Sequence, residues 1–127
     1  MPEDQSWSSW EVIDAGQGVI TGQLLAGCNG DPAHKIVRAM KLLDLNGFPC
    51  SGISYQKVDD RPPTLYVLKG NPSCWRAYFT VDPNRRLILY TWIVCKKTQK
   101  RDKGDTEKAR RNLDAASSKG ATRIQFP

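Results

Sequence analysis

The sequence contains a single histidine, His34, and none of its four cysteines forms a Cys-x-x-Cys pair. A structural zinc site needs four closely placed cysteine or histidine ligands, so this composition argues against one, and we expect no metal. The cysteines are 22, 24 and 21 residues apart, at positions Cys28, Cys50, Cys74 and Cys95. Their flanking residues share no pattern, which argues against an internal repeat. We interpret them as free, partly buried thiols in a reducing cytosol.

The sequence also lacks any apolar run close to the roughly 20 residues that a membrane-spanning helix needs. Residues 1–9 are acidic and polar, without the basic start and apolar core of a secretory signal. We therefore expect a cytoplasmic protein with no membrane contact, in which residues 1–9 form a flexible tail. The 127 residues fit a single domain, 1–127, with one core.

Positive charge is concentrated in the last third of the chain. Residues 1–84 contain 7 Lys and Arg against 9 Asp and Glu, a net charge of −2, whereas residues 85–127 contain 12 against 4, a net charge of +8. Much of the excess lies in the run 96–103, which directly follows the apolar segment Leu87–Cys95. A local patch of this kind is typical of surfaces that contact nucleic acid phosphates.

Two helices are predicted in the first half of the chain. Residues 16–26 have apolar residues at helical spacing, weakened by three glycines. The second helix is predicted between Asp31, a good N-cap followed by Pro32, and Gly47, a good C-terminal residue. Its apolar face contains Ile36, Val37, Met40, Leu42 and Leu43, and His34, Lys35, Arg38 and Lys41 lie mostly on the other face.

Strands account for most of the remaining pattern. Trp10–Ile13 is predicted as a first strand, and a short extended piece is expected at 53–58. Short turns then separate strands at 64–69, 74–81 and 87–95, and connections this short join antiparallel neighbours in a meander. The class is therefore α+β: an antiparallel sheet, made of the three-strand meander plus the N-terminal strand, with two N-terminal helices packed on one face.

Alternation along the meander predicts which side chains share a face. On the middle strand Arg76 and Tyr78 should lie on the more exposed face, opposite an apolar face that starts at Trp75. On the last strand Leu87, Leu89, Thr91, Ile93 and Cys95 should share one face. A helix at 106–117, with Asp105 as N-cap, should follow, then a flexible 117–120 and a possible last strand at 123–126.

This order of elements, together with its residues, resembles the RelE/HigB superfamily of type II toxins, most closely its phage-derived HigB-like branch. The match is strongest over 64–113, where Trp75-Arg76-Ala77-Tyr78-Phe79 precedes an apolar strand that runs into Lys96-Lys97-Thr98-Gln99-Lys100. The resemblance implies a RelE-like fold and an mRNA interferase, an RNA endonuclease that acts mostly on the ribosome and inhibits translation. It also implies a cognate antitoxin as partner, mRNA and the ribosome as targets, and no cofactor.

The implied reaction is attack of the RNA 2′-hydroxyl on the adjacent phosphate, which breaks the P–O5′ bond and leaves a 2′,3′-cyclic phosphate and a 5′-hydroxyl. It needs cations at the phosphate and a group that moves a proton. By resemblance Arg76 is the phosphate clamp, and Lys97 and Lys100 hold the RNA backbone or stabilise the developing charge. Tyr78 stacks on a base or donates a proton. The remaining RNA-binding candidates are basic: Lys96, Arg101, Lys103, Arg85, Arg86 and Arg123.

Several alternatives stay open at this point. Arg76 is also explained by pairing with Asp59, Asp60 or Asp82, and the run 96–103 by a solvated turn. Family members often complete the site with a His, Tyr or Arg near the C-terminus, but only Arg123 is present here, which leaves Tyr78, Tyr90 or lysines to move the proton. A non-catalytic nucleic-acid-binding or regulatory module of the same fold, or a phage assembly protein, are the competing functions.

Overall fold

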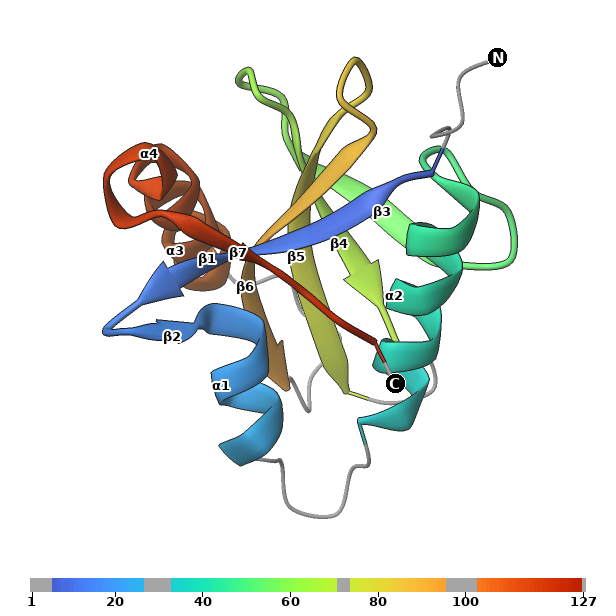
Figure 1. Ribbon diagram of the computed structural model, residues 1–127, viewed down its shortest axis with the longest axis horizontal. Coiled ribbons are helices and arrows are strands. Elements are labelled where there is room, and N and C mark those ends of the chain that lie inside the picture. The colour runs from blue at the N-terminus through green and yellow to red at the C-terminus, as the bar shows by residue number, and fades with distance from the viewer. Residues whose placement is uncertain (1–5, 27–32, 71–73, 96–102, 127) are drawn as a thin grey trace.

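The computed structural model describes residues 6–26, 33–70, 74–95 and 103–126, with the side chains of residues 23–26 and 103 left out. Within these residues the chain forms seven strands and four helices (Figure 1). In chain order they are β1 Ser8–Asp14, β2 Gln17–Gly18, α1 Val19–Ala26, α2 His34–Asn46, β3 Ser54–Asp59, β4 Leu65–Lys69, β5 Trp75–Asp82, β6 Leu87–Cys95, α3 Lys103–Asp114, α4 Ala116–Lys119 and β7 Ala121–Arg123.

The strands form one sheet in the order β2-β1-β6-β5-β4-β3, and β7 pairs with the outer edge of β1. The predicted meander is confirmed, and β3 extends it to four antiparallel strands. The N-terminal strand is also confirmed, but it pairs with β6 in parallel. The two helices carry the chain to β3 at the far edge of the sheet, and the meander then returns to β6 in the direction of β1. In Figure 1, β1 and β7 run side by side as the blue and red strands. The protein is thus α+β with a mostly antiparallel open sheet.

The two faces of the sheet carry separate cores. The main core lies under α1 and α2 and contains Ile20 and Met40 from the helices with Ala77 and Phe79 from β5. A smaller second core lies under α3, where Ala109 packs with side chains of β4 and β5. The prediction that two N-terminal helices share one face is therefore confirmed. The C-terminal helix covers the opposite face, which the sequence pattern had left exposed.

A β-bulge at Thr91 changes the alternation along β6. Tyr78 pairs with Trp92 while Phe79 pairs with Tyr90, so Thr91 has no partner in β5. The prediction of one uninterrupted face from Leu87 to Cys95 was wrong for this reason. Beyond the bulge, Ile93 joins the main core beside Tyr90, and Trp92 packs at the second core. Asn112 of α3 donates a 2.7 Å hydrogen bond to the Thr91 carbonyl, which anchors the helix at the bulge.

The helix boundaries differ from the prediction by up to three residues: α1 begins at Val19 instead of 16, and α3 spans Lys103–Asp114 instead of 106–117. Helix α2 begins at His34 after Ala33, which makes no capping hydrogen bond, and the expected cap at Asp31 and Pro32 lies outside the described residues. Its C-terminus at Gly47 is confirmed, with a φ of 81° and an N–H bond to the Leu43 carbonyl. Helix α3 starts at Lys103, so Asp105 lies inside its first turn.

Both chain ends are more ordered than predicted over their described parts. Ser9 is completely buried, and its hydroxyl donates a 2.7 Å hydrogen bond to Asp44. Trp7 packs against Gly47 and the main core. The predicted flexible tail is thus wrong for residues 6–9, while 1–5 lie outside the described residues.

The predicted flexible segment 117–120 forms most of α4, and the last strand is Ala121–Arg123. None of the helices in the described ranges is long and apolar enough to cross a membrane.

Tyr90 is fully buried in the main core, and its hydroxyl has no hydrogen-bond partner among the described residues. A buried hydroxyl without a partner has lost its bonds to water and regained none, so Tyr90→Phe should raise the free energy of unfolding by about 1 kcal/mol. Chemical denaturation measures this change, and Tyr66→Phe, at a half-buried position of the same sheet, should stay within about 0.5 kcal/mol. A loss of stability in the Tyr90 variant would show that the hydroxyl is bonded.

Candidate nucleic-acid interface

Three strands place the predicted phosphate clamp at one end of the sheet. Strand β4 ends at Lys69, β5 begins at Trp75, and β6 ends at Cys95, so these positions meet. Arg76 is directly opposite Lys69 on one neighbour and Val94 on the other. We call this the Arg76 end of the sheet. Cys95, the last described residue before the basic run, therefore lies at this end.

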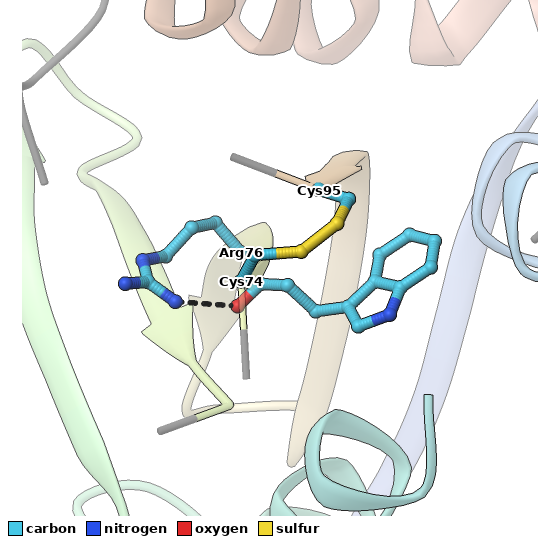
Figure 2. Close-up of a disulfide and its surroundings, with 4 residues drawn as sticks. Cys74, Arg76 and Cys95 are labelled. Carbon is cyan, nitrogen blue, oxygen red and sulfur yellow. Dashed lines mark hydrogen bonds between the residues drawn. A yellow bond between two sulfur atoms is a disulfide. The ribbon is translucent and has the colours of Figure 1, made fainter. Parts of the chain in front are cut away.

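Arg76 and Tyr78 are both buried, with 8% and 4% of their surfaces exposed. The prediction that they lie on an open face was wrong, because α3 packs over this side and encloses Tyr78 in the second core. The Arg76 guanidinium donates a 2.9 Å hydrogen bond to the Trp75 carbonyl. Figure 2 shows its side chain extending away from the neighbouring disulfide. Arg76 is thus held within the sheet end instead of projecting into solvent.

A disulfide joins the two strands at the same end. Cys74, immediately before β5, is bonded to Cys95, the last residue of β6, with the Cα atoms 5.0 Å apart (Figure 2). The expectation of free thiols was wrong for this pair, which the sequence separates by 21 residues. It is confirmed for Cys50, which is free and buried, while Cys28 lies outside the described residues. The cross-link fixes the point at which the basic run begins.

The other predicted RNA-binding residues do not gather at the Arg76 end. Arg85 and Arg86 occupy the turn at the opposite end of the β5–β6 hairpin, roughly 20 Å away by strand length. Arg123 is exposed on β7, beyond β6 and β1. Lys96, Lys97, Lys100 and Arg101 lie outside the described residues, and Lys103 is described only as the start of α3.

The carboxylates considered as partners for Arg76 bind other cations. Asp59 accepts hydrogen bonds from Arg61, and from the buried Arg110 of α3 at 3.0 Å. These bonds, first of all those from Arg61, hold the pKa of Asp59 well below its ordinary value. Asp60 pairs with Lys57, and Asp82 pairs with Arg85. The Asp59–Arg110 contact was missed from the sequence, because its partners are 51 residues apart and no local pattern connects them.

Among the tyrosines proposed to move a proton, Tyr90 is in the wrong place. It is completely buried in the main core, on the face opposite Tyr78, and burial raises its pKa far above the ordinary value. A phenol in this position stays protonated and does not reach a substrate. The described part of the Arg76 end thus contains two cations, Arg76 and Lys69, and no exposed acid or tyrosine.

No family model matches the chain, and no curated protein matches it either. Within the described ranges no group of three His, Cys, Asp or Glu side chains is placed to hold a metal ion.

Proposed function

We propose that this protein is a RelE/HigB-like toxin, an mRNA interferase that cleaves messenger RNA and is neutralised by a cognate antitoxin. What supports the proposal is the chain order: a strand, two helices on one face, an antiparallel meander and a C-terminal helix, the order on which the resemblance is based. The single observation that carries it is the position of Arg76 opposite Lys69, at the sheet end where the basic run begins.

In this proposal the cations act on the phosphate at which the RNA is cut. Arg76 binds the phosphate oxygens, and Lys97 and Lys100 stabilise the negative charge that builds when the 2′-hydroxyl attacks. Arg76 is only 8% exposed, and in this proposal the phosphate reaches it at the Arg76 end of the sheet. Positioning and electrostatics then supply most of the catalysis, and the antitoxin blocks the basic surface.

The burial of Tyr78 favours a second candidate, a nucleic-acid-binding module of the same fold that does not cleave. Without Tyr78 or Tyr90 at the surface, the described residues near Arg76 offer no proton-moving group. Such a module should bind RNA with a steep salt dependence, log K falling by about 0.7 per phosphate contact for each unit of log salt, and should yield no cleavage products.

Tightly controlled expression in a bacterium, followed by primer extension on abundant messages, tests the proposal. The wild type should arrest growth and produce new 5′ ends, and Lys97→Ala and Arg76→Lys should abolish both. Arg76→Lys keeps a cation in the buried position but cannot form the bidentate contact that a guanidinium makes with phosphate. Lys57→Ala, which removes an exposed cation paired with Asp60, is the matched control and should remain toxic.

Thermal unfolding of each purified variant separates loss of activity from loss of folding. Intact messages at wild-type levels of folded protein would contradict the interferase and leave the binding module. Cleavage that survives both Arg76→Lys and Lys97→Ala would retain the enzyme but overturn its site.

A further inference from the structure

A second cationic site lies beside the Arg76 end, on the side covered by α2. A cavity of about 380 Å³ opens between α2, the turn before β3 and the end of β4. Its lining includes three cations from two elements, Lys35 and Arg38 of α2 and Lys69 of β4. No acidic residue is among the described residues that line it.

These three cations differ from most others in the structure. Among the described residues, carboxylates pair with Lys57, Arg61, Arg85, Arg110 and Lys119. No described carboxylate or other polar partner binds Lys35, Arg38 or Lys69. Lys35 and Arg38 are one helical turn apart on α2 and exposed, and Lys69 is half-buried at the rim. Uncompensated positive charge around a concave surface concentrates anions there.

The rest of the lining is suited to a nucleotide more than to a bare anion. Ala39 and Leu42 of α2 and Ile53 of the preceding turn add apolar surface next to the cations. A sugar or base can rest against such surface while its phosphate contacts the cations. Lys69 also stands opposite Arg76 across the β4–β5 pair, so it borders both the cavity and the Arg76 end.

We propose that this cavity is a second phosphate site, which binds a backbone phosphate of single-stranded RNA next to the one held at Arg76. The inference rests on the proposed function for the identity of its ligand, since a small phosphorylated molecule presents the same chemistry. Lys69 serves as the link between the two phosphates. The basic face of α2 is thereby part of the RNA path and not only a solvated helix surface.

Titration of ¹⁵N-labelled protein with inorganic pyrophosphate tests the site without RNA. In the wild type the amide signals of Gly52, Ser54 and Gly70 should shift with saturation. The triple variant Lys35→Ala/Arg38→Ala/Lys69→Ala should lose these shifts. The control Lys57→Ala/Arg111→Ala/Lys119→Ala removes the same charge from exposed positions outside the cavity and should retain them. Absence of saturable shifts in the wild type would overturn the site.

Fluorescence anisotropy with a labelled, uncleavable 2′-O-methyl RNA of twelve nucleotides then tests the ligand. The cavity variant should bind roughly tenfold more weakly than the control variant at moderate salt, and its salt slope should be smaller in magnitude by about 0.7, as expected for the loss of one phosphate contact. If the cavity variant and the control variant lose RNA affinity equally, while the wild type still shows saturable pyrophosphate shifts, the RNA assignment is overturned in favour of a small phosphorylated ligand. A wild type that binds no RNA would reject the proposed function separately, because the pyrophosphate result stands by itself.

Discussion

Replacing Asp59 by asparagine should lower the free energy of unfolding by about 3 kcal/mol, because it leaves the buried Arg110 guanidinium without its carboxylate. The Arg110 side chain is 7% exposed and that of Asp59 is 12% exposed, and their contact is 3.0 Å long. Arg110 also donates to the Arg61 carbonyl, so its position is fixed from two sides. Urea unfolding of the two proteins at neutral pH measures the difference. Asp60→Asn, at an exposed pair with Lys57, should change stability by less than about 0.5 kcal/mol.

The difference in unfolding free energy between wild type and Asp59→Asn should also depend on pH, in a direction set by the pKa of Asp59. Hydrogen bonds from the Arg61 side chain and backbone, and from Arg110, lower the pKa of Asp59 in the folded state. The stabilisation is therefore complete above the unfolded-state pKa of about 4, and it is lost as the pH falls through the lower folded-state pKa. The gap between wild type and Asp59→Asn should be constant from pH 7 to about 5 and should narrow below about 4. A gap that widens toward acid would contradict this assignment.

Removing the carboxylate of Glu11 should have an effect of similar size. Glu11 is 3% exposed on β1, and its carboxylate accepts hydrogen bonds from the N–H groups of Ile20 and Thr21 at 2.8 and 2.9 Å and from the Thr21 hydroxyl at 2.6 Å. These N–H groups belong to the first turn of α1 and have no partner within the helix. Glu11→Ala leaves them unsatisfied and should cost about 3 kcal/mol.

Hydrogen exchange locates the effect of the Glu11 variant. Amides of α1 should lose protection before those of β5 and β6, because the carboxylate ties this helix to the sheet. Glu11→Gln keeps one acceptor and should lose less stability than Glu11→Ala. Glu107→Ala, at an exposed position of α3, is the control and should be close to neutral. A uniform loss of amide protection across the sheet would show that Glu11 stabilises the whole fold instead of α1 alone.

Gly18 illustrates why the sequence pattern was ambiguous in this region. Three glycines at 16–22 lowered the expectation of a helix, yet α1 forms from Val19. A Cβ atom at Gly18 would overlap the Glu11 carboxylate, so a larger residue there would displace that carboxylate from its hydrogen bonds to α1. Helix propensity alone treats such a glycine as a weakness.

The Arg76 end also has features that could not be predicted from the sequence. Arg76 was predicted as a site residue from the sequence, through the resemblance over 64–113, whereas Lys69 opposite it was not. The burial of Tyr78 under α3 was not predicted, because it depends on packing between segments that are distant in the chain. The cavity at Lys35, Arg38 and Lys69 was also missed, since α2 and β4 meet only in the folded protein.

The sequence by itself determined the elements whose signals are local. Leu87–Cys95 is a strand as predicted, α2 ends at Gly47, and the short turns set the antiparallel meander. Periodicity, caps and turn lengths involve residues within a few positions, so they can be read along the chain. Tertiary structure decided the bulge at Thr91, the Cys74–Cys95 disulfide and the Asp59–Arg110 contact. Each of these depends on strand register or helix packing that brings distant residues together, and no local pattern encodes that.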